Sequence, residues 1–446
     1  MKTFYTLGPA LLAVHVSMAQ PTQLTFAEAV KIGLHENVVM KNTRNNLRSF
    51  QANKAIRVAA FTPNLGVSSG ISQTSGPQID EQKGLINSIT SNFRASVGSE
   101  LVIFNGNNRI NSLKASAYRL QGQEFLLKRT EQDIINQVAL QFLQVLLDQE
   151  LLRIAEENLL TQQRTLDEIT GFVTAGSRPE VDQYRQRADV KRFELLVIQA
   201  GNALVNDKAA LAQTLQLDPA EDFTVIKPAW DIDHIRAMTF SLEELYTTAL
   251  QNRADFKRLE AIERASLHDY KRAANGYLPY VSGFISFGAS YFNPNDPNVP
   301  TEPFLDQLGS RRSTSYGVNL TIPIWNRMQA RNARITNKVT HENVINAVEN
   351  LEKRVKIEVQ TAYTNFIDVK AAYEVSLAQY DAARLAYETQ QESYTVGLAT
   401  QVELTIANAA FVGARANLAQ TGYRLLFQKI RLDYATGVLT AEGIEN

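Results

Sequence analysis

The sequence at residues 92–103 is NFRASVGSELVI, in which apolar and polar residues alternate. A period of two predicts a β-strand with one apolar and one polar face. A second stretch alternates in the same way from Ser315 to Ile322. We expect each stretch to be the second strand of a β-hairpin, at residues 63–104 and 279–325. The polar tips are predicted at 76–83 and 293–303.

Helical patterns flank both hairpins. Thr25-x-x-Glu28 and Ser241-x-x-Glu244 are capping boxes that open helices running to about residues 60 and 275, before Pro63 and Pro279. After each hairpin the apolar residues recur at coiled-coil spacing, which predicts long helices at 107–170 and 328–393. Final helices are predicted at 179–217 and 400–432. The fold class is therefore mainly α with a small β part.

The chain contains two copies of this arrangement. Pro63 matches Pro279 at an offset of 216 residues, and Gly176 matches Gly397 at 221. A fixed period indicates repeated architecture. We expect a first repeat at 20–220, a connecting segment at 221–239, a second repeat at 240–439 and a tail at 440–446. In each repeat the first and last helices together are about as long as the middle one, so we expect them to stack end to end beside it.

Composition limits the cellular context. Residues 1–19 have the pattern of a cleaved secretory signal peptide, and the chain has no cysteine for a disulfide or an N-terminal lipid anchor. A formal net charge of -1 argues against a nucleic-acid partner. No later stretch is long and uncharged enough for a transmembrane helix, so a membrane role requires the strands.

Four exported amphipathic strands cannot close a sheet alone, whereas only closed barrels satisfy every backbone group in lipid. A homo-oligomer that pools its hairpins is the simplest solution, with polar faces lining a channel. Long helices of about 96 Å would extend that channel into the periplasm. The alternative is an exported periplasmic coiled-coil adaptor or scaffold protein, which shares the long helices but does not need the strands.

The order of these motifs resembles the TolC family of outer-membrane efflux proteins. The family's strand-end pattern is similar to Val102-Ile103-Phe104-Asn105-Gly106 and Ile322-Pro323-Ile324-Trp325-Asn326-Arg327, and its helix turn to Val173-Thr174-Ala175-Gly176-Ser177 and Tyr394-Thr395-Val396-Gly397-Leu398. The resemblance implies a homotrimer with a twelve-stranded outer-membrane barrel and a periplasmic α-helical tunnel. It further implies an exit duct for an efflux or type I secretion system, docked to a periplasmic adaptor (membrane fusion protein) and an inner-membrane pump.

The resemblance also implies a gate, a periplasmic constriction with carboxylates six residues past each turn glycine. Those positions are Asp182 and Glu403, and Tyr394 matches the family's gate tyrosine. A ring of like charges would favour cations. The second family aspartate falls at Ile406 and the latching arginine at Ala399, so the latch differs here. Both carboxylates also lie in the first turn of a helix, where acidic residues suit the helix dipole.

Two further sets of residues follow from this interpretation. The helix turns expected to dock the adaptor comprise Ala175, Gly176, Ser177, Val396, Gly397 and Leu398. The strand residues expected to face lipid are Phe93, Val97, Leu101, Tyr316, Val318, Leu320 and Ile322. Aromatic residues at the strand ends, Phe61, Phe104, Tyr277 and Trp325, are either a membrane-interface belt or packing at the helix-to-strand junction.

No pattern predicts catalysis or a cofactor. His35-Glu36 and His341-Glu342 begin a zinc-protease motif, but Val39 and Ile345 replace its second histidine. Phosphate loops, nucleophile elbows and cysteine nucleophiles are absent from the sequence. We therefore expect no metal, no cofactor and no enzymatic activity, and a passive conduit whose energy comes from the pump.

Overall fold

The computed structural model describes residues 22–80, 84–218, 223–228, 230–294 and 300–441. The predicted signal peptide lies outside these residues, as do parts of the predicted hairpin tips (81–83 and 295–299), part of the connecting segment and most of the tail. The described chain is mainly helical with a small β part, as predicted. It divides into two compact units, and each unit combines segments of both repeats: unit 1 is Met1–Lys41, Thr130–Asn252 and Val355–Asn446, and unit 2 is Asn42–Arg129 and Arg253–Arg354.

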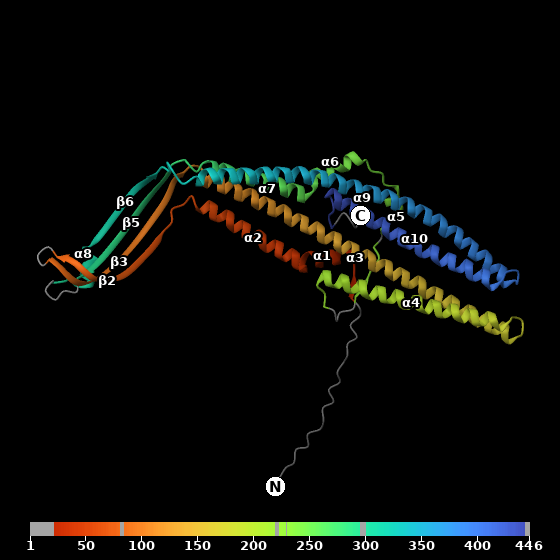
Figure 1. Ribbon diagram of the computed structural model, residues 1–446. Coiled ribbons are helices and arrows are strands. Elements are labelled where there is room, and N and C mark those ends of the chain that lie inside the picture. The colour runs from red at the N-terminus through yellow and green to blue at the C-terminus, as the bar shows by residue number, and fades with distance from the viewer. Residues whose placement is uncertain (1–21, 81–83, 219–222, 229, 295–299, 442–446) are drawn as a thin grey trace, which may run out of the picture. The chain divides into compact units, whose positions relative to one another are not determined.

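Unit 2 contains one antiparallel sheet in the order β2-β3-β5-β6 (Figure 1). Its strands are β2 (Gly66–Asp80), β3 (Gly84–Asn105), β5 (Tyr280–Asn293) and β6 (Arg312–Thr321). The first strand of the first hairpin is longer than predicted, because residues 76–80 continue β2 instead of forming a tip loop. The two hairpins join through β3 and β5, with a register shift between Val102 and Phe104.

The register collects the apolar residues of both hairpins on one face. Val97 lies opposite Val67 and Phe287, and Gly283 lies between Leu101 and Val318. Paired residues of an antiparallel sheet point to the same side, so the predicted lipid-facing residues of β3 and β6 share one face. That face is open: Tyr316 is 79% exposed and Val318 67%. Ile322, which was also assigned to this face, lies one residue beyond the end of β6.

A short helix that the sequence did not predict follows the second tip. It is α8 (Phe304–Ser310), and Phe304 packs edge-on against Phe93 and Tyr291 at 5.3 and 5.1 Å. The fully buried Gln307 accepts the Phe292 N–H at 3.1 Å and donates to the Phe292 carbonyl at 3.2 Å. Its amide therefore takes the place of a neighbouring strand where β5 runs beyond β6.

The opening helix of each repeat is broken, and the prediction of single helices at 25–60 and 241–275 was wrong. The structure has α1 (Phe26–Glu36) and α2 (Val38–Ala59), then α6 (Leu242–Asn252) and α7 (Ala254–Ala274). The breaks fall at Asn37 and Arg253, which are both extended, with ψ of 129° and 120°. Asn37 accepts the Val39 N–H at 2.9 Å and donates to the Thr214 carbonyl, while the buried Arg253 pairs with Asp255. Side-chain contacts therefore make breaks that contain neither proline nor glycine.

The other helices keep equal lengths in the two repeats. Helices α3 (Asn108–Thr174) and α9 (Gln329–Thr395) each have 67 residues, and α4 (Glu180–Leu215) and α10 (Gln401–Thr436) each have 36. The α3 helix runs four residues past its predicted end. None of the described helices has the length and hydropathy needed to cross a membrane.

Unit 1 also contains elements that the sequence did not predict. Strand β1 (Thr22–Leu24) pairs in parallel with β4 (Phe223–Val225), and α5 (Ile232–Ala237) lies in the predicted connecting segment. A core cluster of Phe366, Leu425 and Leu432 packs with Ile232 and Ile235 of that segment. The ring of Phe240, next to the segment, meets Phe366 edge-on at 5.5 Å. The connecting segment is therefore part of the core of unit 1.

We predict that Phe366→Ala lowers the free energy of unfolding by about 3–5 kcal/mol, because a fully buried aromatic ring leaves a cavity when truncated. Chemical denaturation followed by circular dichroism measures this loss. The control is Glu374→Ala on the exposed side of α9, expected to change stability by less than about 0.5 kcal/mol. A loss below about 1 kcal/mol for Phe366→Ala would contradict the assigned core.

Candidate helix-turn site

The two helix turns predicted to dock a partner have the same backbone hydrogen bonds. In the first, the N–H of Gly176 donates to the Val173 carbonyl at 2.9 Å and that of Ser177 to Phe172 at 2.9 Å. In the second, the N–H of Gly397 donates to the Tyr394 carbonyl at 3.1 Å and that of Leu398 to Ser393 at 2.8 Å. Each is a Schellman-type helix ending, which requires a residue with left-handed backbone angles.

Both turn glycines meet that requirement and are open to solvent. Gly176 has φ of +73° and Gly397 has φ of +79°. A Cβ built on either glycine would meet no described atom within 4 Å. Glycine is therefore required here by backbone conformation, and space remains around both turns. Next to the second turn, Leu398 is 85% exposed, an apolar side chain without cover in the described chain.

The carboxylate of Glu403 closes a capping box at the start of α10. It accepts the Thr400 N–H at 2.7 Å and the Thr400 hydroxyl at 2.9 Å, and the Thr400 side chain accepts the Glu403 N–H in return. The backbone hydrogen bond from Thr400 lowers the pKa of Glu403, so this carboxylate is ionised. Glu403 therefore does have the helix-start role that its sequence position suggested.

Asp182 has a different environment in the first turn of α4. Pro179 precedes that helix and supplies no side-chain cap, so Asp182 is not part of a capping box. Its carboxylate lies 3.9 Å from Arg185, and its side chain is 16% exposed. The matching carboxylates of the two repeats thus differ in what they contact.

Tyr394 is 5% exposed in the last turn of α9, and its ring is covered by Arg178. The guanidinium carbon lies 4.2 Å from the ring centroid, a cation–π distance. Burial raises the pKa of Tyr394, and the positive charge of Arg178 opposes this shift. Arg178 follows Gly176 by two residues, as Ala399 follows Gly397. The sequence shows that the latching arginine is missing at Ala399, but Arg178 at the matching position of the first repeat was not recognised from it.

Buried amides join the same two helix pairs near the turns. Gln186 of α4 is 1% exposed and donates to both the carbonyl and the side-chain oxygen of Gln162 on α3, each at 2.9 Å. Its own side-chain oxygen accepts from Gln401 of α10 at 2.9 Å. Sequence reasoning missed this chain of three amides because glutamine is common on exposed helix surfaces.

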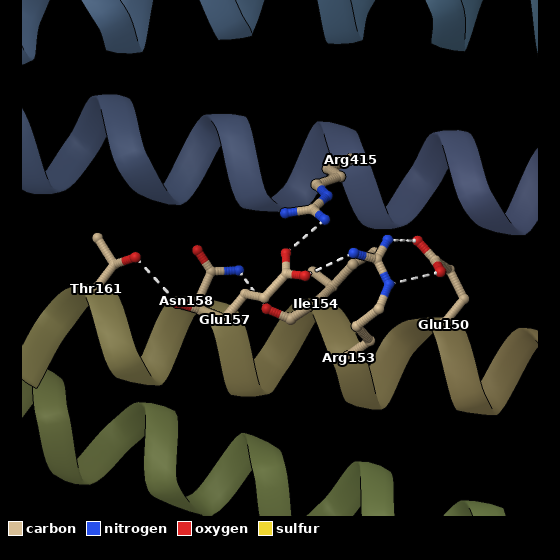
Figure 2. Close-up of polar contacts among 7 residues, drawn as sticks. All are labelled: Glu150, Arg153, Ile154, Glu157, Asn158, Thr161 and Arg415. Atoms are coloured by element: carbon tan, nitrogen blue, oxygen red, sulfur yellow. Dashed lines mark hydrogen bonds and ion pairs between the residues drawn. The ribbon is translucent and has the colours of Figure 1, made fainter.

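Ion pairs also connect α3 to α10. Arg415 of α10 donates to Glu157 of α3 at 2.7 Å, and Arg153 lies between Glu157 and Glu150 (Figure 2). The hydrogen bond from Arg415 lowers the pKa of Glu157. Further along, the Tyr434 hydroxyl donates to Asp133 at 2.7 Å. Polar contacts therefore tie the first helix pair to the second over many turns.

The arrangement is suited to holding helices together. Among the described residues, no cluster of three or more histidine, aspartate or glutamate side chains could hold a metal. His341, from the incomplete zinc-protease pattern, instead shares a hydrogen bond with Ser266 at 2.9 Å.

Comparison with known proteins identifies the family. A family model described as outer membrane efflux protein matches residues 32–215 and 245–438, which lie in the two repeats. BepC, an outer membrane efflux protein of Brucella suis biovar 1, is 20% identical over 94% of this chain and 87% of its own length. The outer membrane protein TolC of Salmonella enteritidis is 23% identical, and this match spans only 40% of TolC and 44% of this chain.

Solved structures have the same fold. The structure of CusC matches with a TM-score of 0.78 at 15% identity, covering 92% of both chains. The open MtrE outer membrane channel of Neisseria gonorrhoeae matches with a TM-score of 0.75 at 16% identity, covering 93% of this chain and 91% of that one. Because the family model matches both repeats over most of the chain, the protein belongs to the outer membrane efflux protein family and acts in efflux at the outer membrane.

Proposed function

We propose that the protein is the exit duct of an efflux system, formed by a homotrimer that pools its strands into one twelve-stranded barrel. The observation that carries this proposal is the four-stranded sheet, whose apolar face is exposed and whose outer strands β2 and β6 have no partner strand among the described residues. In lipid, backbone groups on those two edges must be paired, and closure with further copies pairs them.

The two faces of the sheet fit this role. The apolar face, with Phe93, Val97 and Leu101 on β3 and Tyr316, Val318 and Leu320 on β6, would contact lipid. The opposite face carries small polar residues that would line the lumen, such as Ser68 opposite Ser96 and Ser286 opposite Ser315. A periplasmic adaptor and an inner-membrane pump would supply cargo and energy.

The strand-end aromatics divide between the two expected roles. Phe61 lies beneath Arg109, with 4.8 Å between the guanidinium carbon and the ring centroid, which supports junction packing. Trp325 is 72% exposed, and we assign it to the membrane interface.

We further propose that Asp182, Glu403 and Tyr394 form the periplasmic constriction, with Arg178 holding Tyr394 in its closed position. Arg178 belongs to the turn of the first repeat and Tyr394 to the second, so their contact ties one helix pair to the other. This contact would take the place of the latch that Ala399 cannot provide. The open turns, residues 175–177 and 396–398, would dock the adaptor.

The duct proposal predicts that the two faces respond differently to charge. Val318→Arg places a cation on the proposed lipid face and should sharply reduce the detergent-extracted trimer, since arginine costs about 2–4 kcal/mol at the bilayer midplane. Asn319→Arg, on the opposite face of the same strand, should insert normally. Membrane fractionation and size-exclusion chromatography measure both. Recovery of the wild type in the periplasm without detergent would refute the duct.

The constriction proposal concerns conductance. We expect Asp182→Ala combined with Glu403→Ala to raise single-channel conductance or reduce cation selectivity in planar bilayers, because a ring of acidic groups attracts cations and narrows the opening. Asp189→Ala, which removes a carboxylate paired with Arg192 further along α4, is the control and should leave both quantities unchanged. Unchanged values for the double variant would remove these carboxylates from the constriction.

The docking proposal predicts that Leu398→Arg abolishes export without reducing the amount of inserted trimer. Gly176→Arg and Gly397→Arg should act likewise, whereas Asn at either glycine should retain export, because asparagine tolerates left-handed backbone angles. Drug susceptibility of a deletion strain carrying each variant measures export. Normal export by all three arginine variants would show that the turns dock nothing.

A further inference from the structure

Unit 2 contains a pocket, whereas the helix turns belong to unit 1. Its volume is about 340 Å³, within the range of about 300–1,000 Å³ found for small-molecule sites. Helices α2, α3, α7 and α9 all contribute to its lining. Phe50, Ile262 and Val344 give it apolar walls, while its polar groups come mainly from α3 and α7.

The acceptors in this pocket already have partners. The carboxylate of Asp269 is paired with Arg119 and also lies 3.5 Å from Arg272. The Ser266 hydroxyl donates to the Glu263 carbonyl at 2.7 Å, so it accepts from Nδ1 of His341. These groups therefore do not require a ligand, and the single carboxylate is compensated by two arginines.

Two donors in the lining have no partner. Gln123 is 7% exposed, and its Nε2 makes no hydrogen bond within the described structure. Arg258 lines the same pocket, and no ion pair or hydrogen bond engages its guanidinium in the described part of the chain. A buried donor without an acceptor costs free energy, and native structures rarely leave one. The buried Nε2 of Gln123 therefore requires an acceptor, and the half-buried Arg258 adds an unpaired positive charge to the same pocket.

We propose that this pocket binds a small amphipathic anion. A carboxylate or sulfonate group would accept from Arg258 and from Nε2 of Gln123, and the apolar body would lie against Phe50, Ile262 and Val344. Arginine suits this role because its planar fork matches a carboxylate. The site is separate from the proposed constriction and does not depend on the proposed duct.

The test uses the purified full-length protein in non-ionic detergent, titrated with sodium benzoate by isothermal calorimetry against a detergent blank. We expect saturable binding of benzoate and none of benzylammonium, which has the same ring and the opposite charge. Arg258→Gln should weaken benzoate binding at least about tenfold, since hydrogen bonds to charged groups are among the strongest. Arg264→Gln, on the exposed side of the same helix, should bind as the wild type does.

A second pair of variants fills the pocket while keeping its charge. Val344→Trp, or Thr340→Trp if the first does not fold by circular dichroism, should also weaken benzoate binding at least about tenfold. The proposal is overturned if the wild type shows no saturable binding, if Arg258→Gln or the folded tryptophan variant binds as the wild type does, or if Arg264→Gln weakens binding equally. Equal binding of benzoate and benzylammonium would overturn it too.

Discussion

The backbone groups on the two open edges of the sheet are the constraint on which the rest of this structure depends. Four antiparallel strands satisfy one another internally, but β2 and β6 each present an edge with no partner strand in the described chain. The register of the strands adds a second cost, because it gathers the apolar residues of both hairpins on one exposed face. A single copy in water would bear both costs together. Closing the edges with further copies, in lipid, removes both.

The helices obey a related constraint of length. Helices α3 and α9 have the same length, and so do α4 and α10. The hairpins differ in length, and α8 lies in the second one. Because α3 equals α9 in length and α4 equals α10, each repeat reaches and leaves its turn over the same number of helical residues. Hydrogen bonds from Tyr434 to Asp133 and from Gln401 to Gln186 hold the helices of the two repeats in register.

Periodicity predicted the strands and the long helices because a strand with one apolar face, or a helix with one apolar stripe, has apolar residues at regular spacing in the sequence. The breaks at Asn37 and Arg253 left no such pattern, since contacts with Thr214 and Asp255 produce them. The parallel β1–β4 pair was missed for the same reason, because three-residue strands are too short to show alternation. In the candidate site the turn glycines were found by matching the repeats, and the carboxylates through the resemblance to the TolC family. Matching the repeats also places Arg178 opposite Ala399. Only the structure shows that its partner, Tyr394, belongs to the other repeat.

The side-chain amide of Gln307 affects where a further strand can pair with the sheet. Its side chain occupies the N–H and the carbonyl of Phe292, in the stretch of β5 that extends beyond β6, so a foreign strand cannot pair with those two groups. Polymerisation through sheet edges is a general hazard of open sheets. One side chain thus protects this part of the sheet, while the long outer strands β2 and β6 keep their open edges in the described chain.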